Sequence, residues 1–147
     1  MGAAGCVQKE VSPPQGYVLA KVSDLKEEEF GYLVVLRASD AEGRLTMVVS
    51  REQGERMRFL LAGEKPPRPW MHHTFAALLA KLGKRVSYVS VDSLRGDTYY
   101  ASIHIAGVEP IDARPSDAII LALIEGAPIY VNSQLLEKPS LPGAIAA

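Results

Sequence analysis

Residues 111–126, IDARPSDAIILALIEG, have the pattern of a strand end that leads directly into a helix. Pro115 suits the first helical position, where its missing amide hydrogen costs nothing. Residues 118–124 are apolar on every side, and Gly126 is typical of a residue that ends a helix. The segment therefore predicts a helix that is buried on more than one face.

A similar strand-to-helix corner lies 63 residues earlier in the chain. With this shift, the identical aligned pairs are Arg51 with Arg114, Leu60 with Leu123, and Gly63 with Gly126. With a shorter turn in the second half, Tyr32 aligns with Tyr99. The sequence predicts an α+β fold built from a duplicated β-β-β-α unit, at about residues 17–63 and 86–131. Two copies imply one compact domain with pseudo-twofold symmetry, in which mixed or antiparallel sheets pack against helices.

The expected elements follow from apolar spacing and from turn residues. Strands are predicted at 17–22, 31–38, 45–49, 86–91, 98–106, 108–112 and 128–131, and helices at 52–62, 69–82 and 118–124. The prolines at 66, 67 and 69 separate the first unit from the helix that Pro69 begins. That helix is the extra element between the two halves.

Composition favours one soluble globular domain. The 147 residues are 48% hydrophobic and 22% charged, and the single cysteine, Cys6, excludes an internal disulfide. We expect a domain at residues 15–137 between a flexible tail at 1–14 and a second tail at 138–147. No apolar run reaches the roughly 18 residues that span a bilayer, and no export signal is evident. A cytoplasmic protein without membrane association is therefore expected.

Positive charge is concentrated in the middle of the chain, although the net charge is −1. Residues 44–85 contain nine Lys and Arg residues against three Glu residues. Such a cluster suits a phosphate polyanion because binding releases its counterions. The alternative is that these side chains solubilise two helices.

Comparison of the two halves separates candidate functional residues from those that the fold requires. Asp112 aligns with Val49 and Asp117 with Gly54, so one copy of the corner forms without either carboxylate. On the functional interpretation, both aspartates hold a divalent cation and Arg114 contacts phosphate. On the structural interpretation, Asp117 complements the helix dipole and Ser116 caps the helix.

A second polar corner, RPWMHH at residues 68–73, precedes and begins the central helix. Arg68, the free amides of a helix start and the titratable His72 would form a seat for phosphate. Adjacent histidines on a helix point about 100° apart, so His72 and His73 do not readily share one metal. The alternative is that both are packed or surface residues.

The order of three motifs resembles the bifunctional nuclease domain family. They are Arg68-Pro-x-x-His72, Asp112-Ala-Arg-Pro-Ser-Asp117-Ala, and Gly126-Ala-Pro-Ile-Tyr-Val131, and the resemblance covers about residues 17–137. It implies a compact α+β domain that self-associates as a homodimer or higher homo-oligomer. It also implies the cleavage of DNA and RNA that is reported for some relatives.

The chain departs from that family at three positions. Met71 and His73 stand where the family usually has threonine and aspartate, and Gln53 follows Glu52 where the family has alanine. If the aspartate position binds metal, His73 replaces it with a softer nitrogen ligand.

These observations lead to a nuclease hypothesis with named roles. His72, Asp112 and Asp117 are the predicted catalytic residues, and Arg68, Arg114 and Ser116 are predicted to bind a DNA or RNA substrate. Asp112, Asp117 and His73 would hold a divalent cation, Mg²⁺ or Mn²⁺. The alternative is a non-catalytic module that binds nucleic acid or protein, in which the Asp and Arg residues are structural. A small-ligand sensor at the His72 helix start is a third possibility.

Overall fold

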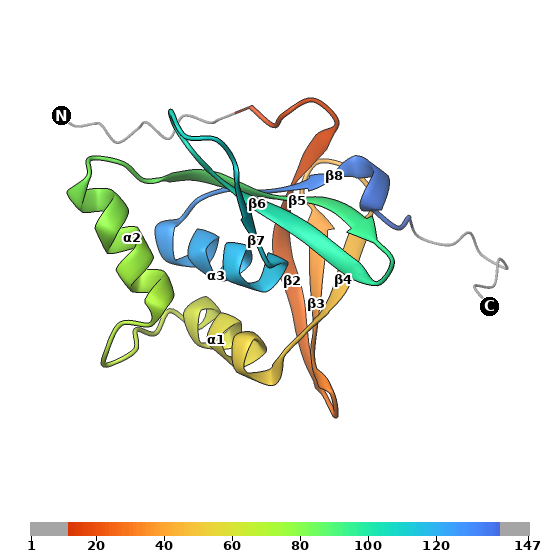
Figure 1. The fold of residues 1–147 in the computed structure, drawn as a ribbon. Coiled ribbons are helices and arrows are strands. Elements are labelled where there is room, and N and C mark those ends of the chain that lie inside the picture. The colour runs from red at the N-terminus through yellow and green to blue at the C-terminus, as the bar shows by residue number, and fades with distance from the viewer. Residues whose placement is uncertain (1–11, 139–147) are drawn as a thin grey trace, which may run out of the picture.

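The computed structural model describes residues 12–138 and confirms the repeated order of elements (Figure 1). The first unit is β2 (Tyr17–Glu28), β3 (Gly31–Ala38), β4 (Arg44–Val49) and α1 (Arg51–Leu61). The second is β5 (Val86–Arg95), β6 (Thr98–Ile105), β7 (Ile111–Ala113) and α3 (Pro115–Glu125). The extra helix α2 (Met71–Lys81) lies between them, and β8 (Ile129–Asn132) and the 3-10 helix η2 (Ser133–Leu135) follow. Residues 1–11, including Cys6, and residues 139–147 lie outside the described part, so most of each expected tail is not covered.

All seven strands form one mixed sheet in the order β4-β3-β2-β8-β5-β6-β7. Each unit contributes an antiparallel meander of three strands. Strand β8 joins the two meanders, since it pairs antiparallel with β2 and parallel with β5. The two units thus become halves of a single sheet, with β4 and β7 at its edges.

Helix α3 lies at the centre of the fold. Figure 1 shows α1 below it, α2 to its left, and strands above it and to its right. Residues 118–122 of α3 are all buried, as the uniformly apolar segment predicts. The core face of the sheet supplies alternate strand residues such as Val34, Leu36, Val89 and Val91. The core is therefore formed mainly by one sheet face and α3, and α1 and α2 add Met57 and Leu79 to it.

Both long hairpins extend further than the apolar pattern indicates. Strand β2 continues to Glu28 and β5 to Arg95, each after a bulge in its pairing with the next strand. The distal parts of β2 and β5 are largely polar, although Tyr32 and Val34 of β3, which pair with β2 there, are buried. Hydrophobic alternation does not mark such segments.

The central helix begins later than predicted, at Met71 instead of Pro69. Trp70 has the extended backbone of a residue that precedes a helix, with φ −80° and ψ 168°. Its amide N–H donates to Nδ1 of His73 at 3.2 Å, which satisfies one free donor of the helix start. This shift places His72 second in the helix.

Tight packing joins α1 to β3 at Gly54, where a Cβ atom would overlap the ring of Tyr32. Tyr32 is 1% exposed, and Gly54 is buried beneath it. The absence of a side chain at Gly54 thus allows α1 to lie close to the sheet. No helix among residues 12–138 is long and apolar enough to cross a membrane.

Candidate functional site

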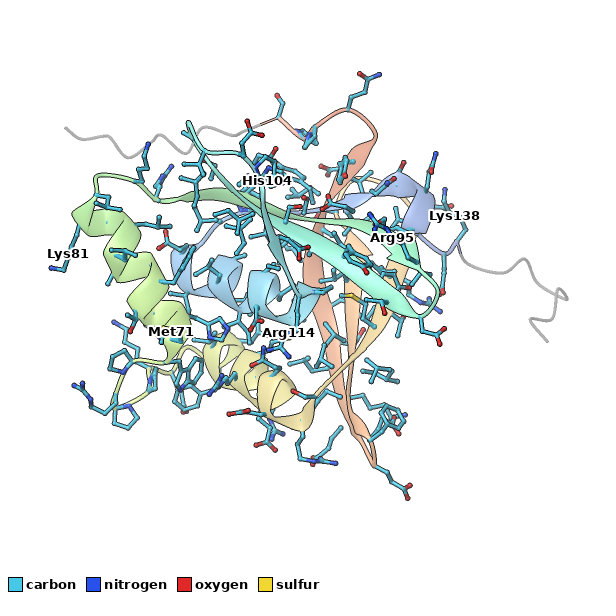
Figure 2. All side chains as sticks on the ribbon, in the orientation of Figure 1. Met71, Lys81, Arg95, His104, Arg114 and Lys138 are labelled. Carbon is cyan, nitrogen blue, oxygen red and sulfur yellow. The ribbon has the colours of Figure 1, made fainter. Side chains whose placement is uncertain are left out.

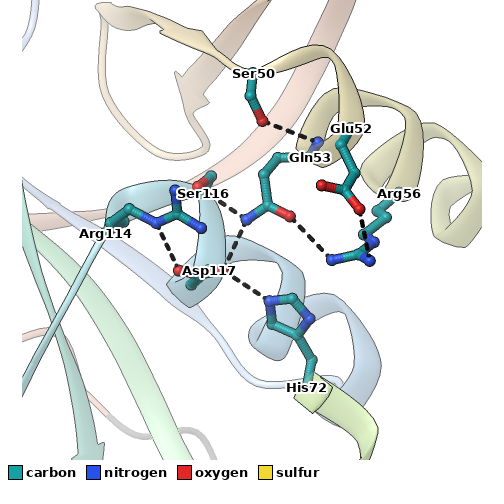
Figure 3. Close-up of polar contacts among 8 residues, drawn as sticks. All are labelled: Ser50, Glu52, Gln53, Arg56, His72, Arg114, Ser116 and Asp117. Atoms are coloured by element: carbon teal, nitrogen blue, oxygen red, sulfur yellow. Dashed lines mark hydrogen bonds and ion pairs between the residues drawn. The ribbon is translucent and has the colours of Figure 1, made fainter. Parts of the chain in front are cut away.

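The first turns of α2 and α3 and the start of α1 bring polar side chains together around Asp117 (Figure 3). Oδ1 of Asp117 accepts a hydrogen bond from Nε2 of Gln53 at 2.7 Å and lies 2.8 Å from Nε2 of His72. Oδ2 accepts from Nε of Arg114 at 2.8 Å. One carboxylate therefore connects all three helices.

Local sequence explains the position of each group. Arg114 precedes α3 with extended backbone and Pro115 begins the helix, so Asp117 lies in the first helical turn as predicted. On α1, the Ser50 hydroxyl accepts from the amide of Gln53 at 3.2 Å and fixes the start of that helix. The side chain of Gln53 is then directed towards α3.

The site keeps Asp117 in its charged form. Partial burial acts to raise the pKa of Asp117, but the hydrogen bonds from Arg114, His72 and Gln53 outweigh it and lower that pKa below its usual value. The same hydrogen bond raises the pKa of Arg114. The pair is an ionised carboxylate beside a guanidinium at neutral pH.

This charge state fixes the tautomer of His72. Because an ionised carboxylate only accepts hydrogen bonds, Nε2 of His72 must carry the hydrogen that points to Asp117. Nδ1 is buried and has no hydrogen-bond partner among the described residues. The side chain is 12% exposed, so the ring lies at the edge of the site with one unsatisfied nitrogen.

Arg114 and its aligned counterpart Arg51 make different contacts. Arg51 binds the β2–β3 turn, through Glu27 at 2.6 Å and through the backbone carbonyls of Glu28 and Glu29. Arg114 uses Nε on Asp117 and is 69% exposed, and its terminal nitrogens make no hydrogen bond within residues 12–138. Arg51 therefore holds a turn in place in the first unit, whereas Arg114 in the second unit has terminal N–H donors that make no such contact in the described part of the chain.

Gln53 is the buried residue of this site that sequence reasoning did not select. It is 3% exposed, and its Nε2 donates to both Asp117 and the Ser116 hydroxyl, the latter at 3.1 Å. Its Oε1 accepts from Arg56 at 3.3 Å, and Arg56 also pairs with Glu52 at 3.0 Å. The available signal was glutamine at position 53, where the family usually has alanine. A buried amide needs hydrogen-bond partners, so a glutamine at this position indicates a polar contact.

These groups border a cavity of about 420 Å³, which we call cavity A. Its lining residues are Ser50, Glu52, Gln53, Arg56, Met71, His72, Phe75, Ile103, Arg114, Asp117 and Leu121. The lining thus combines polar groups with apolar side chains. Met71 and Arg114 lie on the same side of the molecule in Figure 2, whereas His104 lies apart from them.

Comparison with known proteins agrees with this architecture. The family model described as "Bifunctional nuclease domain" matches residues 34–143. The chain belongs to the bifunctional nuclease domain family. The family expected from the three motifs is therefore confirmed.

Two relatives show how far the likeness extends. An uncharacterized protein of Mycobacterium tuberculosis is 29% identical over 109 residues, which cover 74% of this chain and 66% of that protein. Bifunctional nuclease 1 of Oryza sativa subsp. japonica is 25% identical over 122 residues, which cover 78% of this chain and 37% of that protein. The chain spans less than two thirds of either relative.

Within this family member, four of the predicted site residues lie together. His72, Arg114 and Asp117 line cavity A, and Ser116 is buried behind them with its hydroxyl bonded to Gln53. Of the nine basic residues in the 44–85 region, all of them described, Arg56 alone lines this cavity. The 44–85 region thus supplies one basic side chain to the cavity, from the middle of α1.

The other three predicted residues lie outside this cluster. Asp112 is exposed on β7, where its neighbours Ile111 and Ala113 pack on the core, so strand alternation directs Asp112 to the opposite side. His73 contacts Trp70, and burial together with the nearby His72 lowers the pKa of His73. Arg68 is exposed in the proline-rich loop.

The expected metal ligands Asp112, Asp117 and His73 are therefore not assembled into a centre. Among residues 12–138, no three His, Cys, Asp or Glu side chains are grouped so that they could hold a metal ion. The donors present do not fit a preformed metal site, in which several protein ligands surround the ion. The cavity lining carries a carboxylate, an imidazole and a guanidinium in Asp117, His72 and Arg114.

Proposed function

We propose that this protein is a nuclease that hydrolyses phosphodiester bonds of DNA, RNA or both in cavity A. The observation that carries the proposal is the Asp117 carboxylate, which holds His72 and the exposed Arg114 at the wall of one cavity. Membership of the bifunctional nuclease domain family supports it, as do the rice relatives named bifunctional nucleases.

Arg114 is the proposed phosphate ligand. A guanidinium with free terminal nitrogens binds two phosphate oxygens at once and offsets the charge that develops during hydrolysis. The Nε bond to Asp117 orients the guanidinium. Ser116 supports the site from behind through its bond to Gln53.

Asp117 and His72 are the proposed groups for water and proton handling. A carboxylate has about four acceptor positions, and Oδ2 receives one hydrogen bond, so this oxygen can accept another from water. The bond to Asp117 orients His72, which we assign to proton transfer at the reacting oxygen. Because Nδ1 is covered, this role requires the ring to turn away from Asp117 when substrate binds, so the bond to Asp117 sets the resting orientation of the ring.

A divalent cation, Mg²⁺ or Mn²⁺, belongs in the assay as a variable. Asp117 and Glu52 both line cavity A, and Mg²⁺ is often held by one or two carboxylates together with substrate phosphates. The roles assigned to Arg114, Asp117 and His72 do not depend on such an ion. We also propose that the protein self-associates as a homo-oligomer, as the family resemblance implied. Light scattering measures its oligomeric state.

The test is cleavage of single- and double-stranded DNA and RNA with Mg²⁺, with Mn²⁺ and with chelator. Wild type and Arg114→Ala are purified in parallel, so that a contaminating nuclease would appear in both. Cleavage by wild type that falls at least about 100-fold in the variant supports the proposal, since removing a donor to the developing charge has effects of this size. Equal activity in both, or none in wild type, contradicts it.

A second candidate function is a non-catalytic module in which the cluster stabilises the fold. The observation that favours it is that Asp117 joins α1, α2 and α3 while Nδ1 of His72 is covered. This alternative predicts that Arg114→Ala or Asp117→Asn lowers the melting temperature and that no condition gives cleavage. The two candidates are therefore separated by the same proteins.

A further inference from the structure

A second cavity lies on the other side of Arg114. This cavity B has a volume of about 430 Å³ and shares two lining residues, Ser50 and Arg114, with cavity A. Its remaining lining residues are Thr46, Met47, Val48, Val49, Asp97, Thr98, Tyr99, Pro115 and Ser116. Each cavity has the volume of a typical small-ligand site. The two thus meet at the exposed guanidinium.

Both cavities have walls that suit a nucleobase. Cavity A is lined by four apolar side chains, Met71, Phe75, Ile103 and Leu121, in addition to its polar groups. Cavity B has the half-buried ring of Tyr99, at the start of β6. Aromatic and apolar walls accept any base because each base has a flat π-face.

We propose that cavities A and B take two successive, unpaired nucleotides of one strand, with the phosphate that joins them on Arg114. The proposal rests on the proposed function for the role of Arg114, and it names the substrate class as single-stranded nucleic acid. A base that enters either cavity leaves the duplex stack and its partner, which costs energy that a single strand does not need. The walls predict little preference for base identity.

Charge determines which cavity next to cavity A the strand enters. A third cavity, of about 480 Å³, shares Glu52 and Arg56 with cavity A, but these two are paired with each other. Its wall also carries Glu55, Glu64 and Arg58, so three carboxylates face two guanidiniums and the excess negative charge repels a phosphate backbone. Cavity B is lined by one carboxylate, Asp97, and one guanidinium, Arg114, so it has no excess of negative charge. The strand is thus directed towards Tyr99.

The test is binding of fluorescein-labelled 12-nucleotide DNA, measured by fluorescence anisotropy in chelator, with a gel to show that the probe stays intact. Wild type is titrated with the single strand, with its duplex, and with a single strand whose central bases are replaced by abasic spacers. The single strand is expected to bind at least about 10-fold more tightly than the other two, since each stacked base contributes several-fold. Equal binding of all three overturns the proposal.

The variant arm uses two tyrosines of β6. Tyr99→Ala is expected to weaken single-strand binding at least about 5-fold. Tyr100→Ala is the matched control, because Tyr100 stacks on Arg95 at 4.4 Å and does not line either cavity. Equal losses in the two variants contradict the role of Tyr99, and the abasic probe still tests the proposal if Tyr99→Ala does not fold. Tighter binding of the single strand without any cleavage would contradict the proposed nuclease function but not the two-cavity proposal. Cleavage with equal binding of single strand and duplex would contradict the two-cavity proposal but not the nuclease function.

Discussion

Gln53 and Ser116 lie 63 residues apart, at aligned positions of the two β-β-β-α units, and their side chains are bonded directly to each other at 3.1 Å. Both residues are buried, at 3% and 7% exposure. The contact joins the starts of α1 and α3, so the halves of the repeat meet at the candidate site. Asp117, which aligns with Gly54, adds a carboxylate on one side of this junction only.

Gln53→Glu tests this junction by placing a second carboxylate next to Asp117. The variant loses a donor and gains a repulsion, so we expect the free energy of unfolding at pH 7 to fall by about 1–3 kcal/mol. The deficit should shrink near pH 4.5, where one carboxyl of the pair takes up a proton. Urea denaturation at both pH values measures it.

Gln134→Glu is the matched control for that substitution. Gln134 is exposed in η2, where a carboxylate meets only solvent. Its stability should change by less than about 0.5 kcal/mol. If Gln53→Glu is as stable as wild type at pH 7, the amide hydrogens of Gln53 are dispensable.

The lowered pKa of Asp117 predicts how stability depends on acid. A carboxyl with a folded-state pKa below its unfolded value of about 4 stabilises the fold above that pH and loses the contribution as pH falls through the lower value. The difference in unfolding free energy between wild type and Asp117→Asn should therefore be constant from pH 7 to about 5 and shrink below about 4. Denaturation curves across this range measure it, and a difference that grows in acid would refute it.

Gly54→Ala should destabilise the protein although alanine is the better helix former. At an open helical position the change would stabilise by about 1 kcal/mol, whereas the overlap with Tyr32 predicts a loss of about 1–3 kcal/mol. Tyr32→Ala removes two of the three overlapping atoms, so its cost and that of Gly54→Ala should sum to more than the cost of the double variant. Additive effects of the two substitutions would argue against this contact.

A polar network on β5 and β6 makes His104 sensitive to acid. Tyr17, Ser90 and Ser102 donate hydrogen bonds to the Asp92 carboxylate, at 2.8, 2.8 and 2.6 Å. Ser90 has given its hydrogen to Asp92, so Nε2 of His104, 2.8 Å away, must be the donor to Ser90. The neutral ring is also stacked on Tyr88 at 4.1 Å. Protonation would therefore place a charge in a packed position.

Burial lowers the pKa of His104, against the attraction of Asp92. A histidine with a lowered folded-state pKa contributes stability above its unfolded value of about 6.5 and loses it as pH falls through the folded value. Wild type should thus lose more thermal stability between pH 7.5 and 5 than His104→Gln. His73, whose pKa is also lowered, adds to the loss in both proteins. Parallel melting temperatures across this range would contradict the prediction.

The repeated fold was predictable because its elements recur in the same order, with similar residues at the turns and helix ends. The apolar run at 118–124 indicated the buried helix, and the strand-to-helix corners indicated the repeat. The position of β8 between β2 and β5 was not predictable, since pairing between distant strands leaves no periodic signal. The distal parts of β2 and β5 were missed because their largely polar side chains lack the apolar alternation that marks a strand.

The candidate site was partly predictable for a related reason. Helix starts concentrate free amides and polar side chains, which directed attention to His72, Arg114 and Asp117. Asp112 is five residues from Asp117, but strand alternation separates their side chains. Gln53 was missed because an amide looks like a surface residue until its burial is known.

The most direct test of the account compares Asp117→Asn with Asp112→Asn in one nuclease assay, with melting temperatures for both. Asp117→Asn is expected to lower cleavage at least about 100-fold while it stays folded, the size typical of a lost acid–base or water-orienting group. Asp112→Asn, an exposed change of the same chemistry, should stay within about threefold of wild type, since it touches no group of the site. Loss of cleavage in Asp112→Asn with activity retained in Asp117→Asn would contradict the account.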